Sequence, residues 1–198
     1  MQRLERPRYT EEQYLAMENR SEVRHELVNG DIYAMSGASF AHNLITGNIS
    51  QRLRNALEAA RRPCYVLQSD QRVHVPPSGL YTYPDVTVVC GKPQFHAKDP
   101  LSLLNPVVIF EVLSDSTQDY DRGAKFDHYR LIPALSEVFF VSQTERRIEQ
   151  RCRRDDAHWT LSWFHEDRVR IAALEVELSV DEIYAGVELS NEGPLRAV

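Results

Sequence analysis

Two carboxylates and one amine stand out in this sequence, because they lie in or beside segments that are otherwise suited to buried strands. Asp85 opens the apolar run 86–90, and Glu111 lies among valine, isoleucine and phenylalanine in the run 107–113. An ionised acid in such surroundings costs free energy unless a partner compensates it, and a divalent cation is a common strong partner. Lys125 follows in the next segment. An amine close to such acids could stabilise developing negative charge or orient a water molecule.

Strand geometry allows the two acids to meet at one cation. Side chains alternate along a strand, so Glu111 shares a face with Ile109 and Leu113. If the strands that carry Asp85 and Glu111 are neighbours, both carboxylates can converge on one metal ion. Mg²⁺ is commonly held by one or two carboxylates together with water and substrate phosphate oxygens. A metal ion in that position can generate a hydroxide-like nucleophile and stabilise charge on phosphorus.

A helix is expected to bring Lys125 to the same place. The sequence predicts a helix over 119–131, which a following proline ends. On this helix Asp121, Lys125 and Tyr129 fall at four-residue steps and form one stripe. Such a stripe can present Lys125 to the end of the sheet where the two acids lie.

Each of these residues also has a structural interpretation when it is considered alone. Glu111 could form a buried salt bridge with an arginine, Asp85 could be a strand-entry residue, and Lys125 could pair along an exposed helix surface. His42, at the start of another helix, could contact substrate or could pack and cap locally. Taken together, the two acids and the lysine favour a metal-assisted site.

Around these segments the sequence predicts alternating helices and strands. Helices are expected after Thr10, where Gln13 completes a capping box, and over 41–61. An Asn-Gly step at 29–30 predicts a hairpin. Strands are expected over 25–28, 31–35, 64–67, 71–75, 85–90, 107–113, 137–141, 147–152, 159–164 and 176–178, with a polar loop around 91–100 and a turn at 181–184. This order predicts a single α/β domain over residues 1–198, with a mixed central sheet flanked by helices.

The composition is that of an ordinary globular protein with no excess of positive charge. Of the 198 residues, 42% are hydrophobic and 26% are charged, and the formal net charge is −6. That balance argues against a protein that coats nucleic acid without specificity, since such binding depends on neutralising phosphates. It leaves room for an enzyme with a local basic groove around acidic metal ligands.

The sequence predicts a cytoplasmic protein with no membrane association. Its N-terminal residues lack the apolar core of a signal peptide, and its longest apolar run is too short to span a bilayer. The three cysteines, Cys64, Cys90 and Cys152, are far apart and fit no zinc or redox spacing. They are expected to be reduced, buried thiols.

The order Pro-Asp, buried acid, lysine resembles the PD-(D/E)XK nuclease superfamily, which has the restriction-endonuclease-like fold. More narrowly, the chain resembles a family of small stand-alone bacterial proteins described as "putative restriction endonucleases". The resemblance covers roughly residues 10–185, and its most specific part runs from Glu111 to Tyr129. The matching segments are His25–Asp31, His42, Tyr83–Val86, Glu111–Thr117, Asp121, Lys125, Tyr129 and Glu137–Val141.

The resemblance implies a Mg²⁺-dependent phosphodiesterase that acts on DNA, in which Mn²⁺ can replace Mg²⁺. A homodimer is also expected, because two copies can cut both strands of a duplex and closed two-fold pairs are the commonest oligomers. It implies that Asp85 and Glu111 are metal ligands and catalytic residues, and that Glu26 is an additional acidic ligand. The chain departs from the family pattern at one position, where glutamate-x-lysine would place a lysine and this sequence has Leu113. Within the superfamily the lysine can migrate to a nearby helix, which makes Lys125 the catalytic candidate.

Two alternatives belong to other functional classes. The first is a catalytically weak or inactive nuclease-fold protein that acts as a nucleic-acid-binding or regulatory module, and Leu113 is the feature that favours it. The second is a metal-free hydrolase that uses Ser114 or Ser116 with His128. No nucleophile-elbow pattern supports this second alternative.

Overall fold

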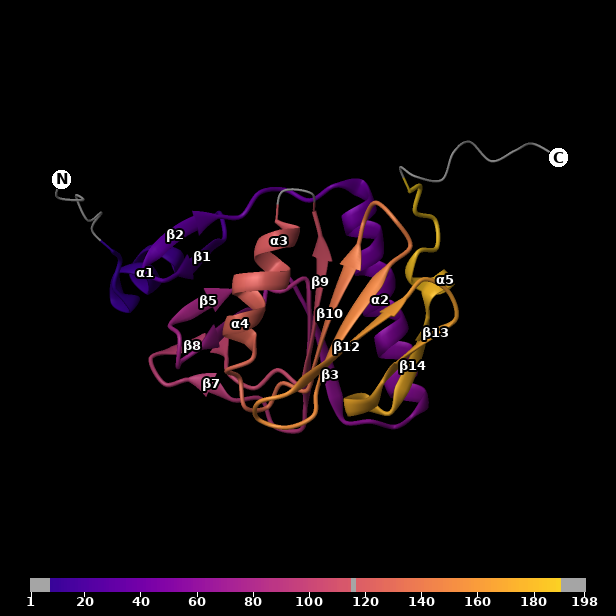
Figure 1. Ribbon diagram of the computed structural model, residues 1–198. Coiled ribbons are helices and arrows are strands. Elements are labelled where there is room, and N and C mark those ends of the chain that lie inside the picture. The colour runs from indigo at the N-terminus through magenta and orange to yellow at the C-terminus, as the bar shows by residue number, and fades with distance from the viewer. Residues whose placement is uncertain (1–7, 115–116, 190–198) are drawn as a thin grey trace.

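Residues 8–114 and 117–189 are described by a computed structural model of the chain. Their strands form two six-stranded sheets and one two-stranded sheet, with helices between and beside them (Figure 1). The mixed α/β class expected from the sequence is confirmed. Ser116 and its neighbour Asp115, which belong to the motif quoted above, lie outside the described residues.

The first sheet is built from the N-terminal half of the chain. Its strand order is β2-β1-β5-β4-β8-β7, with bounds β1 His25–Val28, β2 Asp31–Ala34, β4 Arg72–Val75, β5 Leu80–Thr82, β7 Phe95–His96 and β8 Asp99–Leu103. Asn29 and Gly30 have φ values of 52° and 85°, so the predicted hairpin closes through two left-handed residues. Helix α1 (Glu11–Glu18) begins at Thr10 with the predicted capping box, and it packs Tyr14 against this sheet.

The second sheet holds the segments that the sequence marked as central. Its order is β12-β11-β10-β9-β6-β3, with bounds β3 Cys64–Gln68, β6 Val86–Cys90, β9 Val108–Leu113, β10 Glu137–Ser142, β11 Ile148–Arg153 and β12 Trp159–Phe164. Strands β9 and β10 run parallel, and the other pairs are antiparallel. Val86 pairs with Phe110, so continuing this register by one residue places Asp85 opposite Glu111.

One face of the second sheet is covered by α2 (Phe40–Ala59) and by the C-terminal elements. These are β13 (Arg168–Ile171), the 3-10 turn η2 (Ala172–Leu174), β14 (Val176–Ser179) and α5 (Val180–Ile183). The predicted four-residue repeat of α2 forms its contact face, because Ile45, Ile49, Leu53 and Leu57 are all buried in this core. Although α2 is long, no helix in the described part of the chain is long and apolar enough to cross a membrane.

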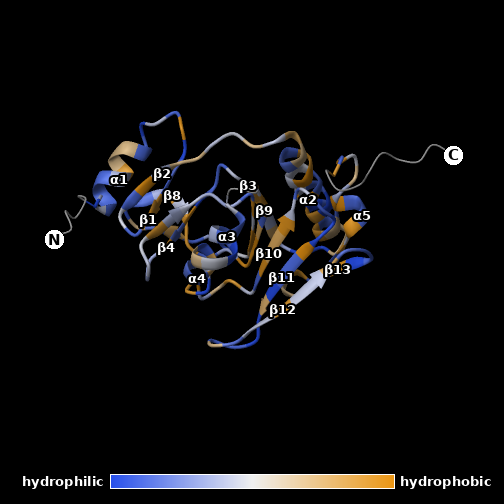
Figure 2. Cartoon of the chain, turned by 45° about the horizontal axis from the view of Figure 1, so that its top comes forward, coloured by the Kyte–Doolittle hydropathy of each residue, from blue (hydrophilic) through white to orange (hydrophobic). Residues whose placement is uncertain are grey.

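The other face of the second sheet forms a separate core with the first sheet. Val73 and Leu103 of the first sheet pack with Ile109 and Phe140 of the second, together with Tyr129. Figure 2 shows hydrophobic colour concentrated along β10, which lies between the two cores. Any polar side chain of β9 that points to this second core therefore enters an apolar space between two sheets.

A short helical segment lies beside β9, between it and strands of the first sheet (Figure 1). The sequence predicts one continuous helix here, whereas the structure has α3 (Gln118–Tyr120), the π-helical turn η1 (Asp121–Lys125) and α4 (Phe126–Tyr129) in succession. A π-helical turn is uncommon and is frequently found at functional sites. Here it contains two of the charged residues of the predicted stripe.

Several short elements differ from the sequence expectation. The segment expected as a polar loop around 91–100 contains β7 and the start of β8, and the short turn expected at 181–184 is helix α5 from Val180. Strands β5 and β13 were not expected. Instead of one central sheet, the described residues form two six-stranded sheets and a two-stranded sheet. Strands β5, β7, β8 and β13 contain two to five residues, so their own residues carry little pattern.

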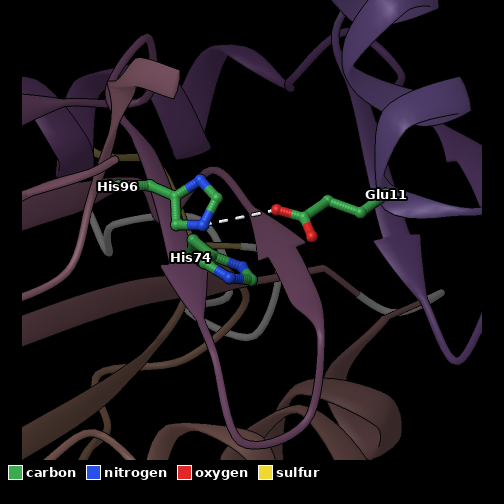
Figure 3. Close-up of side chains that lie close together, drawn as sticks. All are labelled: Glu11, His74 and His96. Atoms are coloured by element: carbon green, nitrogen blue, oxygen red, sulfur yellow. Dashed lines mark ion pairs between the residues drawn. The ribbon is translucent and has the colours of Figure 1, made fainter. Parts of the chain in front are cut away.

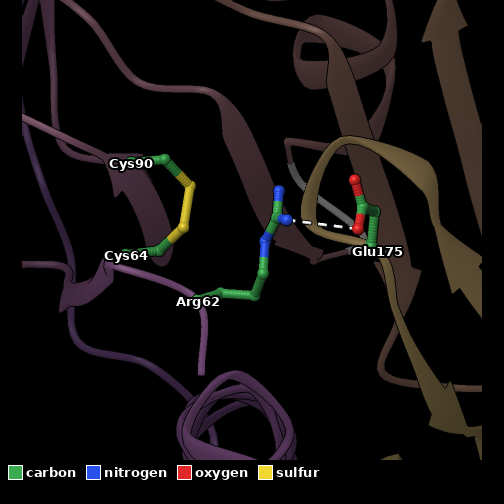
Figure 4. The surroundings of a disulfide bond; sticks show 4 residues. All are labelled: Arg62, Cys64, Cys90 and Glu175. Carbon is green, nitrogen blue, oxygen red and sulfur yellow. Dashed lines mark hydrogen bonds and ion pairs between the residues drawn. A yellow bond between two sulfur atoms is a disulfide. The ribbon is translucent and has the colours of Figure 1, made fainter. Parts of the chain in front are cut away.

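The cysteine prediction is corrected by the register of the second sheet. Strands β3 and β6 are antiparallel with Cys64 opposite Cys90, and the two form a disulfide with Cα atoms 4.0 Å apart. Figure 4 shows this disulfide beside the Arg62–Glu175 ion pair. Cys152 is a free thiol. Cys64 and Cys90 are 26 residues apart in the sequence, and the antiparallel pairing of β3 with β6 places them opposite each other.

Candidate functional site

Glu111 lies on β9 with its carboxylate in the space between the two sheets. Its side chain shares the face of Ile109 and Leu113, as strand alternation predicts, and it is only 4% exposed. The Tyr129 hydroxyl donates a hydrogen bond to Glu111 Oε1 over 2.5 Å. Lys125 Nζ lies 2.9 Å from the same oxygen. The buried acid therefore has a cationic and a neutral partner, both from the helical segment that covers it.

Lys125 gathers three carboxylates around its ammonium group. In addition to Glu111, Nζ lies 3.2 Å from Glu26 Oε1 and 3.4 Å from Asp121 Oδ1. Burial lowers the pKa of Lys125, but the charges of Glu111 and Glu26 outweigh burial and raise that pKa well above its ordinary value. Lys125 therefore stays protonated at neutral pH and provides a fixed positive charge at this position.

Glu26 reaches the site from the N-terminal hairpin. It lies in β1, and its carboxylate accepts a hydrogen bond from the Thr82 hydroxyl of the neighbouring strand β5. The side chain is 12% exposed, so it lies at the mouth of the buried space. The structure thus places the acid that the resemblance added beside Lys125.

Asp85 lies at the entrance of β6, next to Glu111 rather than in contact with Lys125. Its Oδ2 accepts a hydrogen bond from the backbone N–H of Val112 over 2.7 Å, and His42 Nε2 lies 3.2 Å from the same oxygen. Burial lowers the pKa of His42, but its hydrogen bond to Asp85 and the charges of Asp85 and Asp121 outweigh burial and raise that pKa above the ordinary value.

Sequence reasoning left the role of His42 open and did not single out Thr82. In the structure the His42 ring contacts the site residue Asp85, and the His42 backbone N–H donates a hydrogen bond to the Ser39 side chain, whereas a contact with substrate stays a prediction. The signal that could have found it is its position in the first turn of a helix that packs against β6 and β9. Thr82 carries no such signal, because the short strand that holds it was not predicted.

The assembled site has more negative than positive charge. Four carboxylates, those of Glu26, Asp85, Glu111 and Asp121, share the space with Lys125 and the imidazole of His42. Burial raises the pKa of Glu111 above its ordinary value; the charge of Lys125 opposes this rise, and the charges of Asp121 and Asp85 add to it. Carboxylate oxygens are the ligands that Mg²⁺ and Mn²⁺ prefer, so the donor set fits a hard divalent cation.

Comparison with known proteins connects this arrangement to a family. A family model with the description "Putative restriction endonuclease" (Uma2) matches residues 11–182. An uncharacterized protein of Synechocystis sp., slr1290, is 34% identical over 182 residues, which cover 91% of this chain and 94% of that protein. A second uncharacterized Synechocystis protein, sll1609, is 35% identical over 153 residues, which cover 77% and 85% of the two chains.

A solved structure shares the architecture. It is the crystal structure of a protein from Anabaena variabilis described as "a putative nuclease belonging to DUF820". The TM-score is 0.71 over 87% of this chain and 96% of that chain, at 13% sequence identity. The likeness therefore lies in the fold, a mixed α/β arrangement in which sheets are flanked by helices.

Proposed function

The chain belongs to the Uma2 family, and from this premise we propose that it is an endonuclease that hydrolyses DNA phosphodiester bonds with the aid of Mg²⁺. The observation that carries the proposal is the contact between the Lys125 ammonium and the Glu111 carboxylate. Although Leu113 occupies the motif position of the lysine, the Lys125 ammonium lies 2.9 Å from the buried carboxylate of Glu111. The charge that the family pattern requires is thus supplied from the covering helical segment.

Asp85 and Glu111 would hold the divalent cation, with Glu26 as a further acidic ligand, and Mn²⁺ could replace Mg²⁺. The excess of carboxylates over cationic groups supports this assignment. When bound, a divalent cation would supply Lewis-acid stabilisation of phosphoryl charge and would promote ionisation of water.

The chain's own residues would prepare the site for an anionic transition state. Lys125 stays protonated and offers N–H donors to charge that develops on the phosphate. Tyr129 and Lys125 hold one oxygen of Glu111, while His42 and the Val112 N–H hold one oxygen of Asp85. Each acid therefore has its orientation fixed before substrate arrives, which reduces the reorganisation needed during reaction.

We further propose that the protein acts on DNA in the cytoplasm and that two copies associate, since a symmetric pair can address both strands of a duplex. Light scattering coupled to size-exclusion chromatography would measure the mass in solution. A mass of one chain at all concentrations and in the presence of DNA would exclude the dimer without touching the assignment of the site.

A second candidate function is supported by the same ion pairs. Lys125 already neutralises part of the charge of Glu111 and Glu26, and Leu113 is buried among apolar side chains. A cation would have to compete with this amine, so the protein could bind or regulate nucleic acid without efficient cleavage. Nucleic-acid binding that is unaffected by chelator and by Asp85→Ala would favour this function over the nuclease.

Plasmid nicking in Mg²⁺ and in Mn²⁺ tests the proposal. Glu111→Gln and Lys125→Met keep the approximate side-chain volumes and should each abolish nicking, whereas the exposed surface change Lys98→Met should leave it intact. Circular dichroism of each variant shows whether the fold is retained. Robust nicking by both site variants would refute the proposed site, and Mg²⁺ binding by calorimetry separates loss of metal from loss of the ammonium.

A further inference from the structure

A second group of potential metal ligands lies on the first sheet and shares no residue with the site described above. Its members are Glu11 from α1, His74 from β4 and His96 from β7 (Figure 3). Each offers one ligand atom, and these atoms all lie within 4.8 Å of one another. Three elements that are distant in the sequence therefore direct two imidazoles and a carboxylate to one point.

His74 is held in the orientation that a metal-binding histidine needs. Its Nδ1 lies 3.0 Å from the Leu80 carbonyl oxygen, and because a carbonyl only accepts, Nδ1 must carry the proton. Nε2 therefore presents its lone pair. The ring is 4% exposed and stacks on Tyr81 with centroids 3.9 Å apart, which fixes its plane. A histidine ligand that donates its other ring N–H to a backbone carbonyl is the usual arrangement around a metal ion.

Protein partners account only partly for the other two residues. His96 Nε2 lies 3.4 Å from Glu11 Oε1, a long contact for an ion pair. His96 Nδ1 is buried and has no hydrogen-bond partner among the described residues. Glu11 Oε1 also accepts a hydrogen bond from the Tyr81 hydroxyl over 2.7 Å. Tyr81 thus orients the carboxylate and one imidazole together, as outer residues of metal sites do.

We propose that Glu11, His74 and His96 bind a first-row transition-metal ion, with Zn²⁺ as the ion the donor set fits best. Two imidazoles and one carboxylate are a ligand set of zinc sites that keep a fourth position open. Imidazole nitrogen disfavours Mg²⁺ and Ca²⁺. The general affinity order places Cu²⁺ above Zn²⁺, so the assignment of Zn²⁺ rests on the type and number of the ligands and not on that order.

The surroundings leave room for a fourth ligand. A cavity of about 260 Å³ adjoins the cluster, and Glu11, His74 and Tyr81 are among the residues that line it. Water or a small external ligand can therefore reach the open position. Because Glu11 belongs to α1 whereas the histidines belong to the sheet, the metal ion would also fix the N-terminal helix to the first sheet.

Zn²⁺ titration of metal-free protein by calorimetry tests the site. The wild type should bind one equivalent of Zn²⁺, and Glu11→Gln and His96→Ala should each weaken binding by at least ~10-fold. Glu12→Gln is the matched control, because Glu12 is the neighbouring helix residue, is exposed and pairs with Lys98 instead. Asp85→Ala should retain the Zn²⁺ equivalent in excess Mg²⁺, which separates this site from the proposed nuclease site.

Two further readouts keep the proposal testable if one variant folds poorly. Co²⁺ bound to the wild type should give the strong visible absorption of a tetrahedral site, and this absorption should disappear in Glu11→Gln. Zn²⁺ should also slow amide hydrogen exchange in α1. Equal Zn²⁺ affinities of the wild type and both ligand variants, or Co²⁺ binding without a tetrahedral spectrum, would overturn the proposal.

Discussion

Replacing Lys125 with methionine should destabilise the fold strongly, because it leaves Glu111 without its cation. Both side chains are nearly fully buried, and the pair is 2.9 Å apart. Removal of one partner of a buried ion pair typically costs about 3–5 kcal/mol. Glu26 and Asp121 would also lose their shared cation, which puts the expected cost of Lys125→Met at the upper end of this range.

A double-mutant cycle assigns that cost to the pair. Glu111→Gln removes the charge that Lys125 neutralises, so Lys125→Met should be less harmful in that background, with a coupling of roughly 1–3 kcal/mol. Full recovery is not expected, because Glu26 and Asp121 still lose their shared cation. Lys98→Met removes an exposed lysine and should leave the free energy of unfolding unchanged within error.

The assay is urea unfolding of the wild type, the two single variants, the double variant and the control Lys98→Met, monitored by circular dichroism. The buffer contains chelator, so that no divalent cation compensates the acids. The midpoint and slope of each curve give the free energy of unfolding. Additive effects of Lys125→Met and Glu111→Gln would refute the reasoning, because they would show that the two groups do not interact in the folded protein. Loss of nicking without a change in stability would likewise contradict the described burial of the pair.

Three other predictions concern regions outside the candidate site. Burial raises the pKa of Glu137 above its ordinary value, so the folded state binds its proton more tightly than the unfolded state. The stability contributed by Glu137 is therefore greatest at low pH and decreases as pH rises above about 4.5. The urea unfolding midpoint of Glu137→Gln should decrease less than that of the wild type between pH 4.5 and 7. Parallel pH curves of the two proteins would contradict this. The disulfide closes a loop with a sequence separation of 26, so the double variant Cys64→Ala, Cys90→Ala should lower the free energy of unfolding by about 3.5 kcal/mol. The control Cys152→Ala should leave the free energy of unfolding nearly unchanged. A reductant that does not shift the wild-type unfolding curve would show that the bond is absent. Leu53→Ala removes a fully buried side chain of α2 and should cost about 2–5 kcal/mol by the same assay, and a cost near zero would mean that α2 does not pack as described.

The parts of the fold that sequence predicts are those with a strong local signal. The repeat of α2, the capping box at Thr10 and the Asn-Gly hairpin each specify their element within a few residues. Strands β6 and β9 are recognisable because they are mostly apolar, with Thr87 and Glu111 as their polar residues. Strands β1, β2 and β4 of the first sheet were predicted, whereas β5, β7 and β8 were missed, because strands of two to five residues carry little local pattern.

The disulfide and the charged side chains of β11 are two further features that local sequence patterns do not predict. Pairing of Cys64 with Cys90 depends on the register of two strands, which neither strand specifies alone. Charged side chains alternate along β11, a pattern typical of a solvated strand face, yet Glu149 is 3% exposed and Arg151 lies over the Phe126 ring. The helical segment packs onto this face, and sequence periodicity does not show which face a distant segment will cover.

Under the proposed function, Lys125 takes the place of a lysine at position 113. On β9 a side chain at 113 points to the same side as Glu111, and here Leu113 uses that direction to fill the core between the sheets. The ammonium group instead contacts Glu111 from the π-helical turn, which contains both Lys125 and its ion-pair partner Asp121. The cation is thus carried by a helical segment that is held to the second sheet by the packing of Phe126 and Tyr129 and by side-chain contacts, rather than by strand hydrogen bonds. The geometry of the site therefore depends on the docking of that segment, which a lysine fixed in the central strand would not require.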